Sequence, residues 1–197
     1  MYKRNWAGFI VLACFSVTFL ACNSKTPNEQ ANKKNNVNQP VSGFPADSFA
    51  YYENALAKDT ANMGLRMALA TNYYSEKQYD KAILHLQKVY NSDKKNKDVV
   101  ITLGNVYYDA GQYDKGIEFY EKALTIDPKN SNVRCDLATC YLNIKNTEKA
   151  FKLLKKNIEM DYNHAQSHHN LSVVYKQMGK IKESEEELVI FNKLNKQ

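Results

Sequence analysis

A period of 34 residues constrains this 197-residue chain more than any other feature of its sequence. Four leucines recur at that interval, and a tyrosine follows each of them four residues later: Leu69, Leu103, Leu137 and Leu171, then Tyr73, Tyr107, Tyr141 and Tyr175. A spacing of four puts each leucine and its tyrosine on one face of an α-helix. A fixed period of this length indicates stacked structural units, because one such unit cannot bury its apolar face alone.

Two columns of small residues keep the same period. The first column directly follows the leucines and consists of Ala70, Gly104, Ala138 and Ser172. The second column consists of Ala82, Gly116, Ala150 and Ser184, and a large apolar residue stands four places after each member: Leu86, Tyr120, Leu154 and Leu188. Small side chains at these places let two helices approach closely.

The period and its residue pattern resemble the tetratricopeptide-repeat (TPR) family. Residues 97–130 of this chain match the family signature best. The matching residues are Leu103, Gly104, Tyr107, Gly116, Tyr120, Ala123 and Pro128. The resemblance implies an all-α solenoid of about four and a half repeats, in which each unit is a pair of antiparallel helices. We expect a partial, capping repeat at 44–62 and full repeats at 63–96, 97–130, 131–164 and 165–197. Asn157 and Phe191 depart from the pattern, because they stand where Ala123 supplies a small residue.

The turn inside each unit carries its own signal. Gly111 and Gly179 lie where the first helix of a pair is predicted to end, and glycine readily takes the left-handed conformation that closes a helix. Lys77 and Lys145 occupy the same place in the other two units. We expect the same turn there, at a modest energetic cost.

The first residues have the layout of a secretory signal peptide. Lys3 and Arg4 precede an uncharged, mostly apolar stretch at 6–21, which is short for a membrane-spanning helix. Phe19, Leu20, Ala21 and Cys22 resemble the lipobox of bacterial lipoproteins, although residues 11–14 also fit locally. The resemblance implies removal of residues 1–21 and a lipid on the Cys22 sulfur. An uncleaved membrane anchor and plain secretion are the alternatives.

The segment at 22–43, behind that cysteine, is polar and rich in Asn and Lys, so it predicts a flexible tether. In enterobacterial lipoproteins, Asp directly after the lipidated cysteine favours retention in the inner membrane. Position 23 is Asn, so the resemblance implies anchoring in the outer membrane. We therefore expect a lipid-anchored protein of the bacterial cell envelope that faces the periplasm.

Charge does not predict nucleic-acid binding. The net charge is +6, but residues 44–197 carry 22 basic and 20 acidic side chains, mixed along the sequence. A nucleic-acid-binding domain usually concentrates basic residues on one face. The lysine runs at 94–97 and 152–156 are interpreted as solvated helix faces or loops.

The sequence also contains no motif that predicts catalysis, a cofactor or a metal. Cys135 and Cys140 would lie about 8 Å apart on a helix, too far for a disulfide. His164, His168 and His169 are too few to form a zinc site and are interpreted as solvated or groove-lining. We therefore expect a binding protein rather than an enzyme.

In TPR proteins the first helices of successive repeats line a concave groove that binds a partner protein or peptide. The corresponding residues here are Met67, Thr71, Tyr74, Asp98, Ile101, Asn105, Tyr108, Asp109, Asp136, Leu142, His169 and Val173, with Cys135, Thr139 and Lys176 beside them. Aromatic and aliphatic side chains are typical anchors at the centre of a binding surface. We expect a partner segment with apolar side chains and a basic group near Asp98, Asp109 and Asp136.

The alternative is a structural envelope lipoprotein that associates with itself and takes no peptide in its groove. Its interface would be an apolar patch on the last helix, at Val189, Ile190 and Phe191. The same helix carries four glutamates between 183 and 187, which suit the polar end of a solenoid.

Overall fold

The computed structural model describes residues 48–196, which form nine α-helices and no strand. The helices are α1 Ser48–Lys58, α2 Met63–Ser75, α3 Tyr79–Ser92, α4 Lys97–Asp109, α5 Tyr113–Ile126, α6 Ser131–Asn143, α7 Thr147–Met160, α8 Ala165–Gln177 and α9 Ile181–Leu194. The predicted all-α solenoid is confirmed. The predicted signal peptide and tether lie outside the described residues. Within those residues, no helix combines the length and the apolar character needed to cross a membrane.

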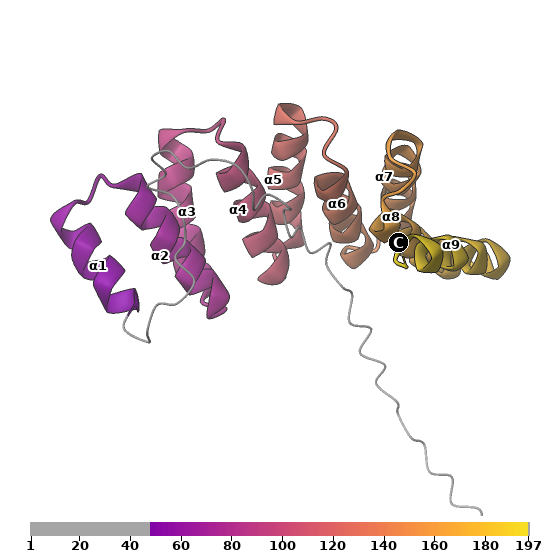
Figure 1. Cartoon of the computed structure of the whole chain (residues 1–197), viewed down its shortest axis with the longest axis horizontal. Helices are drawn as coiled ribbons and strands as arrows, with labels where there is room; N and C mark the ends of the chain where they lie inside the picture. Colours follow the sequence, from indigo (N-terminus) through magenta and orange to yellow (C-terminus); the bar gives the residue numbers. More distant parts are fainter. Residues whose placement is uncertain (1–47, 197) are drawn as a thin grey trace, which may run out of the picture.

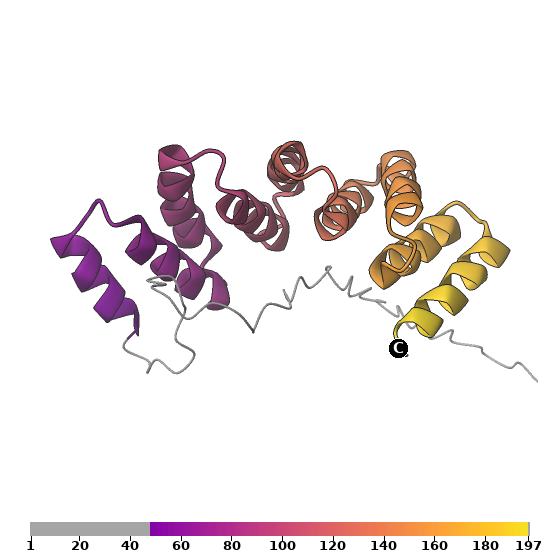
Figure 2. The same ribbon diagram turned by 45° about the horizontal axis from the view of Figure 1, so that its top comes forward.

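The helices stack in one row of antiparallel pairs (Figure 1). The pairs are α2 with α3, α4 with α5, α6 with α7 and α8 with α9, and α1 packs against α2 ahead of them. Each second helix contacts the first helix of the following pair. The row curves so that the first helices lie on its inner side, where α6 also contacts α8 (Figure 2).

Asparagines at one repeat position start three of the first helices. The Oδ1 atoms of Asn62, Asn96 and Asn130 accept hydrogen bonds from backbone N–H groups three residues later, at 3.0, 3.2 and 3.0 Å. Each bond satisfies an amide that has no partner within the helix. These asparagines are 34 residues apart in the sequence, so the period could have revealed them. His164 takes the fourth place and forms no side-chain cap.

The predicted left-handed turns are confirmed. Gly111 and Gly179 have φ angles of 73° and 75°, and Lys77 and Lys145 have φ angles of 58° and 62°. In the turn at Gly111, the next amide, of Gln112, donates to the carbonyl of Tyr107 at 2.8 Å, and the other three turns repeat this bond. One backbone geometry therefore joins the two helices of every pair, whether glycine or lysine occupies the turn.

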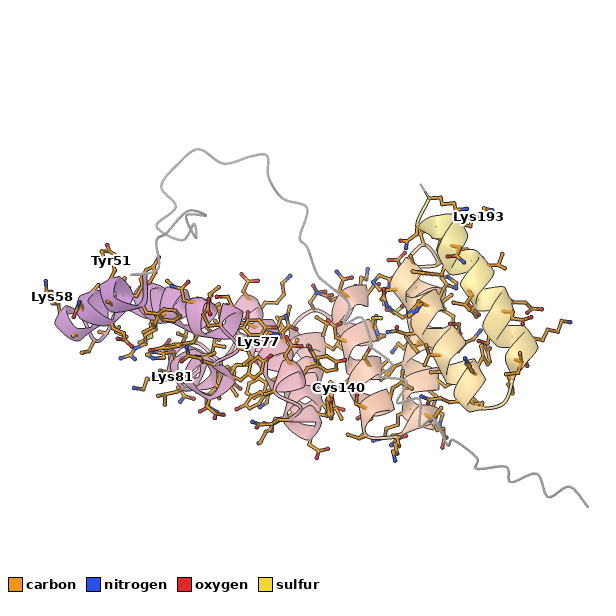
Figure 3. All side chains as sticks on the ribbon, turned by 90° about the horizontal axis from the view of Figure 1, so that it is seen from below. Tyr51, Lys58, Lys77, Lys81, Cys140 and Lys193 are labelled. Carbon is orange, nitrogen blue, oxygen red and sulfur yellow. The ribbon has the colours of Figure 1, made fainter. Side chains whose placement is uncertain are left out.

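The periodic residues form the core. The other leucines are buried, as are Tyr73, Tyr107 and Tyr141, whereas Tyr175 and Leu188 of the last repeat are more exposed. No other described helix packs beyond α9, where Leu188 lies. The small columns bring the helices together, since a Cβ at Gly116 would lie 3.2 Å from the Sγ atom of Cys140. Figure 3 labels Cys140 in the middle of the row. Burial raises the pKa of the Cys140 thiol, which suits a packing role.

Candidate partner-binding groove

The structure places the predicted groove residues on the four first helices. Met67, Thr71 and Tyr74 lie on α2; Asp98, Ile101, Asn105, Tyr108 and Asp109 on α4; Asp136 and Leu142 on α6; His169 and Val173 on α8. Ten of these twelve side chains are half-buried or exposed, while Asp136 and Leu142 are only 7% and 4% exposed. The accessible part of the predicted set therefore lies mainly on α2 and α4.

Two tyrosines at one repeat position join consecutive first helices. Tyr74 of α2 donates a hydrogen bond of 2.5 Å from its hydroxyl to Asp109 at the end of α4. Tyr108 of α4 accepts a longer bond of 3.5 Å from the side-chain amide of Asn143 at the end of α6. Both bonds span 35 residues, so each reaches from one repeat to the next. The two phenol rings thus occupy matching places along the inner side.

A second tyrosine flanks each of these rings and widens the aromatic surface. The ring centroids of Tyr74 and Tyr79 are 6.2 Å apart, and those of Tyr108 and Tyr113 are 5.6 Å apart. These separations fall within the range of favourable aromatic pairs. Tyr79 and Tyr113 begin the second helices α3 and α5, so the sequence pattern for first helices did not include them.

The electrostatic surroundings keep these tyrosines protonated. Burial raises the pKa of Tyr74, and its bond to Asp109 raises that pKa further. Burial likewise raises the pKa of Tyr108 to about 12. Tyr120 is buried beneath them, and its pKa is raised first by burial and then by the charge of Asp136. Asp109 and Asp136 therefore act on one group of tyrosines, Tyr74, Tyr108 and Tyr120, which consists of neutral phenols rather than phenolates.

Asp98 does not belong to this acidic group, which corrects the expectation of one cluster of three aspartates. It lies in the first turn of α4, eleven residues before Asp109. Eleven helical residues span about 16 Å, so a single basic side chain cannot meet both carboxylates. At the helix N-terminus, Asp98 instead interacts favourably with the helix dipole.

Polar side chains join the third and fourth repeats on the same inner side. The Asn170 amide of α8 donates to Cys135 Sγ at 3.2 Å and to Thr139 Oγ1 at 3.0 Å on α6. Gln166 donates to Asn170 at 3.0 Å. Sequence reasoning missed Asn170, although it stands 34 residues after Asp136 and shares its repeat position. These bonds explain how α8 lies directly against α6.

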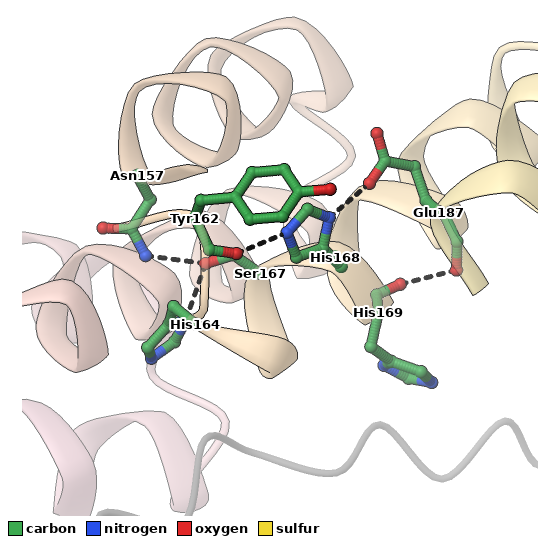
Figure 4. Close-up of polar contacts among 8 residues, drawn as sticks. Asn157, Tyr162, His164, Ser167, His168, His169 and Glu187 are labelled. Carbon is green, nitrogen blue, oxygen red and sulfur yellow. Dashed lines mark hydrogen bonds and ion pairs between the residues drawn. The ribbon is translucent and has the colours of Figure 1, made fainter. Parts of the chain in front are cut away.

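Two of the three histidines are structural, which corrects their interpretation as solvated or groove-lining side chains (Figure 4). Buried His168 contacts Glu187 Oε2 through Nδ1 at 2.6 Å and the Tyr162 carbonyl through Nε2 at 2.8 Å. His164 contacts Ser167 Oγ at 2.8 Å, and burial lowers its pKa. Within residues 48–196, no three His, Cys, Asp or Glu side chains are placed to hold a metal ion.

Comparisons with known proteins agree with this architecture. A family model described as the fourth ARM domain of tetratricopeptide repeat protein 21 matches residues 99–197. A second model, for subunit 3 of the anaphase-promoting complex, matches residues 47–123. No curated protein sequence matches the chain significantly.

Solved structures share the fold at low sequence identity. One structure of MamA has a TM-score of 0.68 and 16% identity, covering 75% of this chain and 86% of that chain. Another MamA structure has a TM-score of 0.62 and 22% identity, covering 76% and 91%. YrrB, described as a TPR protein with an unusual peptide-binding site, has a TM-score of 0.64 and 20% identity, covering 74% and 75%. With paired helices at a 34-residue period and a family model that spans half of its length, the chain belongs to the tetratricopeptide-repeat family.

Proposed function

We propose that this chain is a membrane-anchored scaffold whose concave groove binds a partner protein or peptide within an envelope assembly or secretion complex. The group formed by Tyr74 of α2, Tyr108 and Asp109 of α4 and Asp136 of α6 carries the proposal. Rigid aromatic side chains lose little conformational entropy on binding, and they are frequent anchors of protein interfaces. The peptide-binding site for which YrrB is described supports a binding role for the shared fold.

The chemistry of the group defines the partner segment. Met67 and Ile101 are half-buried and offer apolar contacts two helical turns before Tyr74 on α2 and Tyr108 on α4. A lysine or arginine of the partner placed near Asp109 gains a carboxylate contact and a cation–π contact with the tyrosines. The partner segment is therefore apolar with one basic side chain, and that side chain docks at the end of α4.

The lipobox-like residues ending at Cys22 and the polar segment at 22–43 support the anchor. A lipid on Cys22 holds the chain at the outer membrane, and the polar segment lets the solenoid reach partners in the periplasm. Metabolic labelling with a radioactive fatty acid tests this assignment. The Cys22→Ala variant is expected to lose the label, and retention of the label would refute lipid attachment at Cys22.

In-cell crosslinking tests groove binding. A photo-reactive side chain at position 101 or 108 of the full chain is expected to capture a discrete partner, whereas the same group at position 84 is not. Leu84 is a matched control because it is 53% exposed on the second helix α3. Recovery of the same species from all three positions would argue against the groove.

A double variant supplies the second measurement. Ile101→Glu combined with Tyr108→Ala should abolish partner recovery from membranes, while Leu84→Glu should leave recovery unchanged. Circular dichroism of each variant establishes that the helices are intact. Unchanged recovery with the folded double variant would place the partner elsewhere on the chain.

Exposed apolar residues of α9 favour a second candidate function, a self-associating structural lipoprotein. Of the predicted patch, Val189 is 67% exposed, whereas Ile190 and Phe191 are half-buried. Ile181 and Leu188 are also exposed on α9, and no other described helix packs beyond it. Sedimentation of the full chain in detergent separates the two functions. A stable oligomer at micromolar concentration that Val189→Glu dissociates would favour self-association.

A further inference from the structure

An open surface cavity of about 410 Å³ lies outside the groove, between the second helices of the first two repeats. It is lined by Tyr90 of α3, Lys94 and Lys95 of the α3–α4 loop, and Lys122, Thr125 and Ile126 of α5. We name it the lysine cavity, because half of its lining residues are lysines and none is acidic. Its volume lies in the range of about 300–1,000 Å³ that is usual for small-molecule sites.

The ammonium groups at this cavity exceed the carboxylates that could neutralise them. Neither Lys94 nor Lys95 forms an ion pair with any described residue. Lys122 binds Glu118 at 2.6 Å, but Glu118 also binds Lys115 at 2.8 Å, so two ammonium groups share one carboxylate. Asp93 precedes the two lysines and accepts a hydrogen bond from the Lys95 amide at 2.9 Å, so Asp93 and Glu118 supply two carboxylates against four ammonium groups. The cavity therefore carries an excess of positive charge, which favours an anionic ligand.

Aromatic rings flank Lys122, the least exposed of the three lysines. Lys122 Nζ lies 4.6 Å from the ring centre of Phe119 and 5.6 Å from that of Tyr90. The two rings pack edge to face, with centroids 5.4 Å apart. The ring of Tyr90 and the side chain of Ile126 also give the cavity an apolar wall beside its charges.

The next junction in the same chain lacks these features. The residues 34 positions later are Leu124, Pro128, Lys129, Lys156, Glu159 and Met160. That set contains two lysines and one glutamate and no aromatic ring. The lysine cavity is therefore not a general product of the repeat, and the second junction provides a control of similar geometry.

We propose that the lysine cavity binds a phosphate ester. The phosphate dianion meets the three ammonium groups, and the carbon-containing part of the ester packs against Tyr90 and Ile126. Lysines bind phosphate as point charges, and a phosphate monoester carries about −1.5 to −2 charges near pH 7 against one for a carboxylate, so three lysines favour the phosphate. Soluble esters and lipid headgroups share this chemistry.

Calorimetric titration of the full chain in an uncharged detergent tests the ligand class. Phenyl phosphate is expected to bind with a Kd below about 1 mM, and inorganic phosphate about tenfold more weakly because it leaves the apolar wall uncovered. Benzoate should bind more weakly than either. Equal binding of phenyl phosphate and benzoate, or no binding of phenyl phosphate, would overturn the proposal.

Paired variants tie the binding to the cavity. The double variant Lys94→Ser and Lys95→Ser should weaken the binding of phenyl phosphate about tenfold. The control Lys129→Ser and Lys156→Ser removes the same charge at the next junction and should change the Kd less than about twofold. All four lysines are exposed, so neither variant disturbs the core. Equal weakening by both variants would show a general effect of net charge and refute the site.

Vesicles distinguish the two sources of the ester. The full chain is incorporated into phosphatidylcholine vesicles with or without phosphatidylglycerol, and phenyl phosphate is titrated again. Weaker binding with phosphatidylglycerol, in the wild type but not in the Lys94→Ser and Lys95→Ser variant, supports an anionic headgroup as the ligand. Equal binding in both kinds of vesicle supports a soluble ester.

Discussion

Arg134 of α6 donates a hydrogen bond of 3.0 Å from Nη1 to the Oδ1 atom of Asn157 in α7. Arg134 is 4% exposed and Asn157 is fully buried, so this polar pair lies inside the third repeat. The Asn157 amide also donates to Ser167 Oγ at 2.6 Å, which links the third repeat to the fourth. In the second repeat, the equivalent residues are Val100 and Ala123.

Replacing Asn157 by alanine should lower the free energy of unfolding by about 2–4 kcal/mol, because the buried Arg134 guanidinium loses an acceptor. Arg134→Val combined with Asn157→Ala recreates the apolar pair of the second repeat. The loss of unfolding free energy in the double variant should be about 1–3 kcal/mol smaller than the sum of the losses in the two single variants. Urea unfolding followed by circular dichroism measures all three losses. Single losses that simply add would show that the pair is not coupled.

A second prediction concerns Gly104, where a Cβ atom would lie 2.7 Å from two carbons of the Tyr120 ring. The ring is buried, and its hydroxyl donates to Asn105 at 2.8 Å, so it has little room to move. Gly104→Ala should lower the free energy of unfolding by about 1–2 kcal/mol, because overpacking outweighs the helix-forming advantage of alanine. Urea unfolding measures the change.

The chain supplies the control for Gly104→Ala. In the third repeat the equivalent pair is Ala138 with Leu154, a smaller partner. In the background of Tyr120→Leu, Gly104→Ala should therefore raise stability by about 0.5–1 kcal/mol, the usual gain of alanine over glycine in a helix. The same loss in both backgrounds would mean that Tyr120 is not the obstacle.

The period predicted the helix pairs, the left-handed turns and the core columns, because these depend on contacts that each repeat makes in the same way. It did not predict the link between Arg134 and Asn157, which exists in one repeat only. A signal was present, since both residues depart from the apolar pair Val100 and Ala123 in the same repeat. Recognising it requires knowing which columns of two different helices meet.

The groove was predicted at the level of its helices and less well at the level of its side chains. Helical spacing already separates Asp98 from Asp109 by about 16 Å, so that part of the expectation was avoidable. The burial of Asp136 and the hydrogen bonds of Asn170 could not be predicted from helical spacing, because they depend on how closely α6 and α8 approach. That approach is set by packing between repeats, which the sequence of one helix does not encode.

A third prediction concerns the lysine turns. Lys145 has a φ of 62°, in the left-handed region that costs a residue with a Cβ about 1–2 kcal/mol. Lys145→Gly should therefore raise the free energy of unfolding by about 0.5–1 kcal/mol after the entropy of glycine is subtracted. Gly111→Ala should lower it by about 1 kcal/mol, although no atom lies within 4 Å of the new Cβ. If Gly111→Ala proved neutral, the turn would be unstrained.

A fourth prediction concerns alkaline pH. The hydrogen bond to Glu53 raises the pKa of Tyr73 to about 12, and burial together with the bond to Glu121 does the same for Tyr141. An unfolded tyrosine loses its proton near pH 10. Between pH 10 and 12 the unfolded chain therefore binds fewer protons than the folded chain. Stability should be unaffected by these groups below pH 10 and should fall by up to about 1.4 kcal/mol per pH unit for each tyrosine above it.

The repeats contain the matched control for this titration. Glu53 and Glu121 each accept a hydrogen bond from the tyrosine twenty residues later, whereas at the equivalent place Gln87 donates one to the Tyr107 hydroxyl at 2.7 Å. In Glu53→Gln and Glu121→Gln, the new side-chain amide can therefore donate to the tyrosine hydroxyl, as Gln87 does. Both substitutions remove the carboxylate that opposes ionisation of that tyrosine. Urea unfolding at pH 8.5, 10, 11 and 12 should show a shallower decline for the double variant than for the wild type. Lysines also titrate in this range, but they are common to both proteins, so parallel curves would show that the two carboxylates do not hold the tyrosine protons.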